Sequence, residues 1–170
     1  MRQQKTIGKK FTLTGHGLHT GKEVVLNFKP APADTGIRFV RTDLNPRVEI
    51  PANASAVTTQ SAPSRNTQLA AGGVVINTVE HLLAACYGLE IDNLTVEISA
   101  DEPPEPEDGN YRFFTNPLED AGSVGQGVPC RPLKIGDAVS YRDGDVEIVA
   151  TPADTFRASF TIQFDNPYIG

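Results

Sequence analysis

The sequence predicts an α+β fold in which a sheet packs against a helical layer in two layers. Two changes of hydrophobic period indicate this class. Alternating apolar residues recur before residue 76 and again after residue 93, whereas the stretch between them repeats every three to four residues. A third observation is that residues 131–170 contain only strand patterns. We therefore predict a first domain over 1–122, a linker over 123–130 and the truncated start of a second, incomplete domain over 131–170.

The strand predictions rest on alternation. Val24, Leu26 and Phe28 lie on one side of a predicted strand over 23–28. Similar patterns predict further strands over 36–41, 48–50, 74–76 and 93–99. A segment rich in Ser, Thr, Ala and Pro over 51–64 is predicted to be a loop.

One helix is predicted over 78–87. Its apolar residues fall at i, i+3, i+4 and i+7, namely Val79, Leu82, Leu83 and Cys86. Asn77 followed by Glu80 predicts a capping box, and Gly88 predicts the end of the helix. A second helix over 113–121 is expected to be short or broken, because Pro117 removes a hydrogen-bond donor from its interior.

The remaining segments are read as a loop and a series of strands. Residues 101–110 are acidic and rich in proline, which predicts a loop. After the linker, strands are predicted over 131–135, 138–141, 146–151 and 156–164. Because no helix covers their apolar face, we expect the rest of this domain to be missing or another chain to cover it.

Composition and charge exclude several classes of function. The net charge is −6, divided between +2 for residues 1–99 and −8 for residues 100–170. An acidic second part argues against a nucleic-acid surface, which needs clustered Lys and Arg. No apolar run is long enough for a transmembrane helix, and the first residues lack the apolar segment of a secretory signal. With only two cysteines as well, we expect a cytoplasmic protein.

Glu80 and His81 are the first candidates for chemistry. Adjacent helical residues are about 100° apart, so both side chains reach the same side of a cleft. Ala84 and Ala85 lie one turn further on, and their small side chains leave room there for a bulky group to approach. A neutral imidazole binds a metal ion, and a neighbouring carboxylate serves as a general base toward water. The alternative is that Glu80 only caps the helix and His81 is an ordinary half-buried residue.

The other two histidines lie in the glycine-rich segment 15–21. This segment is read as a hairpin turn or as a place where a ligand approaches the backbone. A strand follows it, so it lacks the helix N-terminus of a dinucleotide-binding fingerprint. His16, His19 and His81 together would suffice for a zinc site, although their spacing is unspecific. Cys86 is expected in the core.

Several ordered motifs resemble one known family, the zinc-dependent UDP-3-O-acyl-N-acetylglucosamine deacetylases (LpxC). The resemblance covers essentially the whole chain. The matching stretches are Gln4-Lys5-Thr6-Ile7, Gly15-His16-Gly17-Leu18-His19-Thr20-Gly21, Lys29-Pro30-Ala31-Pro32, Asp34-Thr35-Gly36-Ile37, Arg41-Thr42-Asp43-Leu44, Thr78-Val79-Glu80-His81-Leu82, Gly88-Leu89-Glu90-Ile91-Asp92-Asn93 and Phe160-Thr161-Ile162.

The resemblance implies a β-α-α-β sandwich of two similar domains with the active site between them. It implies Glu80 as general base, His81 as a zinc ligand, and Leu18, His19 and Thr20 as part of the cleft wall. The implied reaction is hydrolysis of the acetamide of a UDP-linked, acylated N-acetylglucosamine in lipid A biosynthesis. The family's other zinc ligands, a His and an Asp one helical turn apart, have no counterpart here, since His81 is the last histidine.

Three functional hypotheses follow. The chain is the N-terminal half of a zinc deacetylase that needs its other half, supplied in a longer product or by another polypeptide. Alternatively, it is a catalytically inactive remnant that acts as a binding or interaction module. In the third hypothesis it is a stand-alone metallohydrolase that uses His16, His19 and His81.

Overall fold

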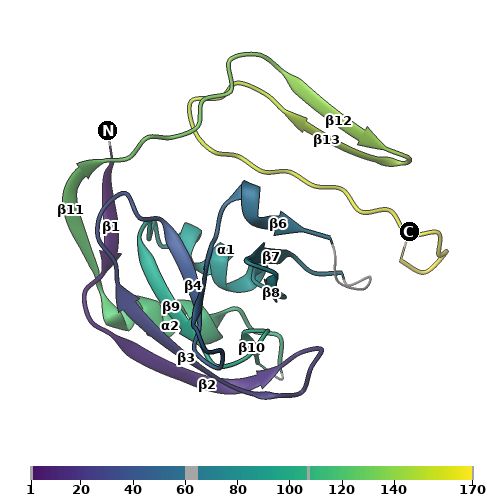
Figure 1. Cartoon of the computed structure of the whole chain (residues 1–170). Coiled ribbons are helices and arrows are strands. Elements are labelled where there is room, and N and C mark those ends of the chain that lie inside the picture. The colour runs from purple at the N-terminus through teal and green to yellow at the C-terminus, as the bar shows by residue number, and fades with distance from the viewer. Residues whose placement is uncertain (1, 60–64, 107, 170) are drawn as a thin grey trace. The chain divides into compact units, whose positions relative to one another are not determined.

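Six strands form a mixed sheet in the computed structural model, which describes residues 2–59, 65–106 and 108–169 (Figure 1). In spatial order they are β10 (Pro104–Glu105), β2 (Phe11–Gly17), β3 (Glu23–Pro30), β9 (Leu94–Ile98), β4 (Ile37–Arg41) and β5 (Val48–Pro51). Neighbouring strands are antiparallel except β4 and β9, which are parallel. Together with two helices in the described residues, this sheet confirms the predicted α+β class.

The inward face of the sheet follows the alternation read from the sequence. Val24, Leu26 and Phe28 are fully buried on β3, and Val96 is fully buried on the neighbouring β9. Phe11 on β2 is directly opposite Phe28, and their rings stack with centroids 4.3 Å apart. Apolar burial of this extent is the main stabilising contribution to the sheet.

Two helices share the core with this face. α1 (Glu80–Gly88) contributes the buried Leu82 and Cys86, and α2 (Arg112–Ala121) contributes Phe114 and Leu118. Pro117 lies inside α2, yet the helix is continuous over ten residues. The short helix predicted over 113–121 is therefore confirmed, and only the alternative of a broken helix is wrong. Burial of one apolar face of α2 compensates for the single donor that proline removes.

The predicted capping box at the start of α1 is also wrong. Val79 occupies the N-cap position and makes no side-chain capping hydrogen bond. The Asn77 side chain instead donates to the carbonyl oxygen of Asp101 at 3.2 Å. Thr78 has a φ of 53°, a backbone conformation outside the right-handed helix, so regular helix begins after it.

A smaller sheet lies beside the first. It contains β6 (Val57–Thr58), β7 (Gln68–Ala71) and β8 (Val74–Ile76). The 3₁₀ helix η1 (Ala54–Ala56) precedes it, with the Asn53 side chain as its cap. The predicted loop over 51–64 is therefore only partly irregular, and its residues 60–64 lie outside the described part of the chain.

The predicted linker over 123–130 is wrong, because most of it is a strand. β11 (Ser123–Pro129) pairs antiparallel with β1 (Gln3–Ile7). No apolar alternation indicates a strand here, since β11 contains Gly125, Gly127 and Pro129. Backbone pairing holds it, and the chain divides into compact units at Met1–Cys130 and Arg131–Gly170.

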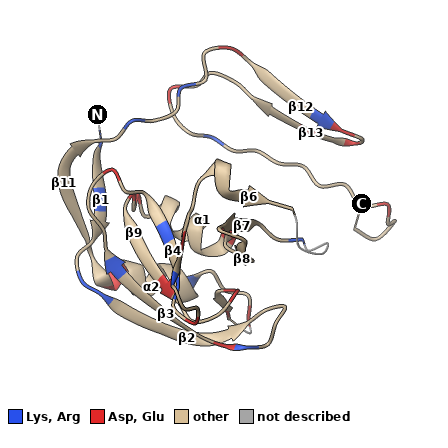
Figure 2. Cartoon of the chain, in the orientation of Figure 1, with Lys and Arg blue, Asp and Glu red and all other residues tan. Residues whose placement is uncertain are grey.

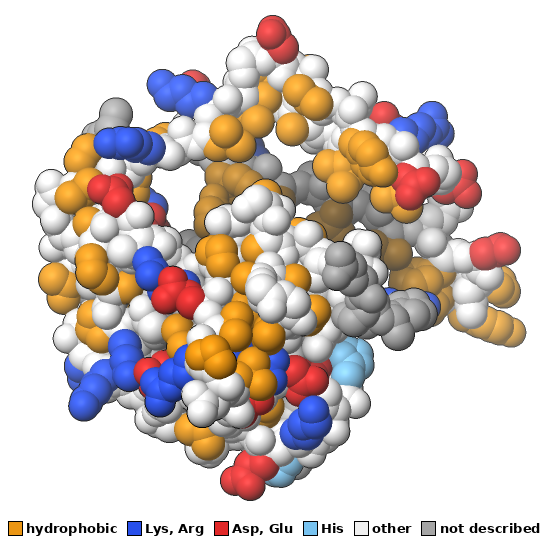
Figure 3. Space-filling model, viewed as in Figure 1, with side chains coloured by type: hydrophobic (Ala, Val, Ile, Leu, Met, Phe, Trp, Pro, Cys, Tyr) orange, Lys and Arg blue, Asp and Glu red, His pale blue; other side chains and the backbone are white. Residues whose placement is uncertain are grey.

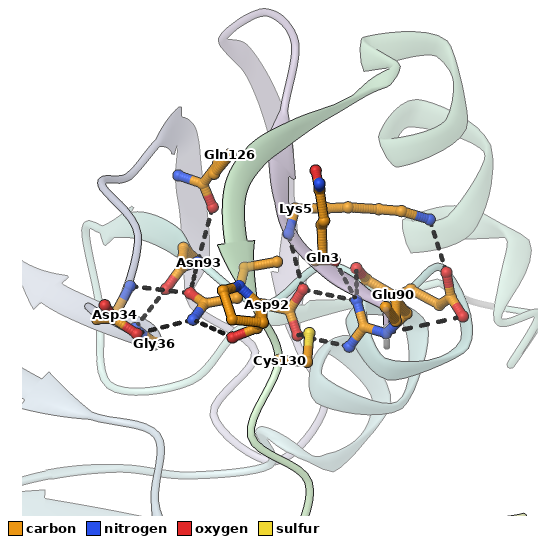
Figure 4. Close-up of polar contacts among 12 residues, drawn as sticks. Gln3, Lys5, Asp34, Gly36, Glu90, Asp92, Asn93, Gln126 and Cys130 are labelled. Carbon is orange, nitrogen blue, oxygen red and sulfur yellow. Dashed lines mark hydrogen bonds and ion pairs between the residues drawn. The ribbon is translucent and has the colours of Figure 1, made fainter.

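Polar contacts around Asp92 stabilise this pairing (Figure 4). Its carboxylate accepts two hydrogen bonds from the Arg2 guanidinium, at 2.6 and 2.7 Å, and one from the Lys5 backbone N–H at 2.8 Å. Burial by itself would raise the pKa of Asp92, but the hydrogen bonds from Arg2 and Lys5 hold it below its ordinary value.

Asn93 extends the same set of contacts to β11. Its amide nitrogen donates to Gln4 at 2.8 Å and to Gln126 at 2.7 Å, and its oxygen accepts from the Gly36 N–H. Gln126 in turn donates to the Ala31 carbonyl oxygen at 2.8 Å. Asn93 is almost fully buried, so these bonds replace the water it loses on folding.

The second unit is Arg131–Gly170, and within its described residues, 131–169, β12 (Val139–Asp143) and β13 (Val146–Ala150) form a hairpin. The strands predicted over 131–135 and 156–164 are absent, because these alternating segments have no neighbouring strand to pair with. Large apolar side chains are exposed along the unit, as Figure 3 shows, among them Leu133, Val139, Ile148, Phe156, Phe160 and Ile162.

Candidate active site

The glycine-rich segment 15–21 joins the end of β2 to β3 through a tight turn, as the hairpin interpretation predicts. Gly15 and Gly17 lie where another residue would collide with its neighbours. A Cβ atom on Gly15 would lie 2.9 Å from Cβ of Pro104, and one on Gly17 would lie 2.6 Å from Oε2 of Glu102. These two glycines therefore allow β10 and the preceding segment to pack directly against β2.

A buried carboxylate connects this turn to the start of α1. Glu102 is fully buried and accepts hydrogen bonds from the backbone N–H groups of His19 and Thr20, at 3.1 and 3.0 Å to Oε2. Its other oxygen accepts from the Thr78 hydroxyl at 2.8 Å. Of the predicted cleft residues Leu18, His19 and Thr20, the last two are thereby linked through one side chain to Thr78, which lies two positions before Glu80 in the sequence.

Glu80 begins α1 and contacts the segment that leads into β7. Its Oε2 accepts from the Thr67 backbone N–H at 2.9 Å, while the Thr67 carbonyl oxygen accepts from the Val79 N–H at 3.3 Å. A carboxylate in the first turn interacts favourably with the positive end of the helix dipole. Oε1 of Glu80 accepts no hydrogen bond from the described residues.

His81 lines a cavity of about 760 Å³ together with Ala84, Ala85 and residues of α2. Its side chain is 50% exposed, and its Nδ1 lies 2.8 Å from Oε2 of Glu105, whose side chain is only 7% exposed. Glu80 is not among the residues that line this cavity. The structure thus brings His81, Ala84 and Ala85 together as expected, whereas Glu80 contacts a different segment.

The three histidines do not form a metal site. Within residues 2–59, 65–106 and 108–169, no three His, Cys, Asp or Glu side chains are placed to hold a metal ion together. The hypothesis of a stand-alone zinc site at His16, His19 and His81 is therefore wrong. Cys86 lies in the core as expected, and burial raises the pKa of its thiol to about 12, which makes it a poor nucleophile.

Glu102 and Glu105 are the residues that the sequence analysis missed. Both lie in the segment predicted to be only an acidic loop, and neither belongs to a hydrophobic period. The available signal was their position, four and seven positions after the end of β9 at Ile98 and beside Pro103 and Pro104, which restrict the backbone.

Charged side chains on the first unit are mixed in sign (Figure 2). Lys29 pairs with Glu97 at 2.7 Å, and Arg38 pairs with Glu49 at 2.8 Å. Such pairing leaves these cations poorly suited to a phosphate backbone. No helix in the described part of the chain is both long and apolar enough to span a membrane.

The α+β fold and the Glu–His pair at the start of its first helix are consistent with a family of deacetylases. Residues 4–170 match the family model described as "LpxC: UDP-3-O-acyl N-acetylglycosamine deacetylase", and the chain belongs to this family. It is an enzyme family, since the matching relatives are named as deacetylases.

Two relatives named UDP-3-O-acyl-N-acetylglucosamine deacetylase are each 45% identical to this chain. The one from Saccharophagus degradans matches 98% of the chain, and the one from Pseudomonas entomophila matches 99%. A bifunctional enzyme LpxC/FabZ from Chlorobaculum tepidum is 42% identical over 98% of the chain. The chain spans 54% of the first two relatives and 35% of the third, so about half or less of their length.

Proposed function

We propose that this chain supplies the N-terminal part of a zinc-dependent, cytoplasmic UDP-3-O-acyl-N-acetylglucosamine deacetylase of lipid A biosynthesis. The observation that carries the proposal is the half-exposed imidazole of His81, which lines a cavity while a buried carboxylate binds its Nδ1. The names of the relatives supply the substrate class, a UDP-linked, acylated N-acetylglucosamine.

In this proposal His81 is one zinc ligand. Metal-binding histidines commonly have a carboxylate beside their second ring nitrogen, and Nδ1 of His81 lies 2.8 Å from Oε2 of Glu105. A half-exposed ring with one nitrogen engaged fits one position of a zinc site. Because no three His, Cys, Asp or Glu side chains of the described residues come together at a metal position, a complete ligand set requires residues from outside them.

Glu80 is the general base. Zinc bound at His81 would polarise the acetamide carbonyl and acidify water at the site. Glu80 accepts a proton from the attacking water and returns it to the departing nitrogen, so acetate and a free amine on the glucosamine result. The Thr67 N–H bond to Oε2 fixes the carboxylate and leaves Oε1 for this proton transfer.

Leu18, His19 and Thr20 form part of the cleft wall beside the substrate. Their turn is held by Glu102, so the wall and the start of α1 keep a fixed relation. The exposed apolar side chains of residues 131–170 indicate a partner: the other half of the family's two-domain sandwich, in the same polypeptide or another chain, covers them.

A second candidate function is an inactive remnant that binds the substrate or a protein partner without catalysis. The absence of a complete ligand set among the described residues favours this reading for the chain on its own. One imidazole retains zinc weakly, so the isolated chain is expected to carry little metal.

The test joins this chain to the C-terminal half of the Pseudomonas entomophila relative, which is 45% identical over the shared part. We expect the joined protein to bind one zinc ion and to release acetate from the UDP-linked substrate. Glu80→Gln should abolish acetate release while zinc stays bound, and His81→Ala should remove the zinc.

Glu23→Gln is the matched control, because Glu23 is an exposed glutamate on β3. It should leave zinc content and acetate release unchanged. A folded, zinc-loaded joined protein that shows no acetate release would support the remnant, and unchanged activity in Glu80→Gln would contradict the assigned base.

A further inference from the structure

Glu105 is a buried glutamate whose contacts the family resemblance does not explain. It lies on β10, and its side chain is 7% exposed. Oε2 lies 2.8 Å from Nδ1 of His81. Oε1 is fully buried and has no hydrogen-bond partner among the described residues. A carboxylate with one unsatisfied buried oxygen is costly, because folding removes water that nothing replaces.

The backbone around Glu105 is held rigidly enough to aim this side chain. Glu105 and Pro104 pair with the end of β2 at His16 and Gly17. Pro104 is buried and packs where Gly15 has no side chain. Two glycines and a proline therefore fix the strand that carries the carboxylate, so its approach to His81 is determined by packing rather than by a flexible loop.

The contact determines which nitrogen of His81 carries the proton. Two acceptor atoms 2.8 Å apart would repel each other, so Nδ1 of His81 carries its hydrogen beside Oε2 of Glu105. In the neutral ring Nε2 then carries the lone pair. Among the described residues Nε2 has no hydrogen-bond partner, and the ring is half exposed at the cavity. The acceptor nitrogen is thus the one left available to a metal ion.

We propose that Glu105 is a positioning residue that fixes the tautomer and orientation of His81, so that Nε2 is presented to a divalent cation. The inference rests on the proposed role of His81 as a metal ligand. Glu105 itself touches neither substrate nor metal and acts only through the imidazole.

The first experiment reads the tautomer in the metal-free 170-residue chain, labelled with ¹⁵N-histidine. Long-range ¹H–¹⁵N spectra, recorded at a pH where the imidazoles are neutral, distinguish protonated Nδ1 from protonated Nε2. His81→Gln assigns the signal. We expect the Nδ1–H form in the wild-type chain and a shift toward the Nε2–H form, which free histidine prefers, in Glu105→Met.

Glu119→Gln is the matched control, because Glu119 is a carboxylate that lines the same cavity without a hydrogen bond to His81. It should leave the His81 tautomer unchanged. Glu105→Gln is the second variant in case Glu105→Met does not fold, and its amide oxygen should retain the Nδ1–H form only in part. A tautomer that is the same in wild type, Glu105→Met and Glu105→Gln would overturn the proposal.

The second experiment titrates the same chains with Co²⁺ and follows paramagnetic broadening of the histidine signals. Loss of a carboxylate behind a metal-binding histidine typically weakens binding by about 10–100-fold. We expect Glu105→Met to raise, by about tenfold, the Co²⁺ concentration at which the His81 signals broaden. The Co²⁺ dependence of the His16 and His19 signals should be the same in both chains and serves as the internal control. An unchanged titration of His81 would overturn the positioning role even if the tautomer shifts.

These readouts are independent of deacetylation. A missing tautomer effect contradicts the role of Glu105 and leaves the proposed reaction standing. A joined protein without acetate release contradicts the reaction and leaves the Glu105–His81 contact standing.

Discussion

Replacing Glu102 by alanine should destabilise the first unit and release the turn that carries the proposed cleft residues. The carboxylate is fully buried and accepts hydrogen bonds from three donors, the N–H groups of His19 and Thr20 and the hydroxyl of Thr78. Each bond to a charged group contributes roughly 1.5–3 kcal/mol. Because His19 and Thr20 are exposed, water replaces part of their two bonds, and we expect Glu102→Ala to lower the free energy of unfolding by about 3 kcal/mol.

Glu102→Gln removes the negative charge of the side chain and keeps its size, so it separates these two contributions to stability. Its amide oxygen can accept from His19 and Thr20, and its NH₂ group can donate to the Thr78 hydroxyl oxygen. Only the charge-assisted part of the bonds is lost, so a decrease of about 1 kcal/mol is expected. Glu23→Ala, which changes an exposed glutamate, should change stability by less than about 0.5 kcal/mol.

The assay is native-state hydrogen exchange in urea. Core amides of β3 and β9 report the stability of the first unit without interference from the second, and the amides of His19 and Thr20 report the turn. Both turn amides should exchange faster in Glu102→Ala than in Glu102→Gln. Equal stability of the alanine variant and the wild type, or unchanged protection of the turn, would refute the reasoning.

Three further predictions concern packing, pH and the second unit. Phe28→Ala should lower stability by about 3–5 kcal/mol in urea unfolding, because it removes a fully buried ring stacked on Phe11, and a loss below about 1 kcal/mol would contradict the packing. The folded-state pKa of Asp92 lies below its unfolded value, so the stabilisation it gives is present above about pH 4 and is lost as the pH falls. Asp92→Asn should therefore show a flatter acid limb in a pH series of unfolding curves, and an identical limb would count against this. Residues 131–170 should be cleaved first in limited proteolysis or cause self-association in sedimentation, because their apolar side chains are exposed, and a resistant monomer would argue against an uncovered face.

Alternation predicted the central strands because their burial is regular. Val24, Leu26 and Phe28 alternate with partly exposed neighbours. The alternation of apolar residues is therefore enough to predict this strand. β1 was missed because two of its buried residues, Gln4 and Thr6, are polar, and hydrogen bonds rather than apolar character explain their burial. Hydrophobic patterns do not detect a strand of this kind.

The candidate site was predicted only in part for a similar reason. Glu80 and His81 were recognised from neighbouring positions on one helix, which is local information. Glu102 and Glu105 act through contacts with residues more than twenty positions away in sequence, at Thr78 and His81. The alternating strand over 156–164 was predicted wrongly since a strand also requires a neighbour to pair with, which alternation does not provide.

The pairing of β1 with β11 has a consequence for folding during synthesis. These are the first and last strands of the first unit, so one leaves the ribosome early and its partner emerges only when that unit is nearly complete. Contacts between such distant segments close a long loop and form slowly. The final step of folding in this unit should therefore be the docking of residues 123–129, and until then the edge of β1 is open to chaperones or to incorrect strand partners.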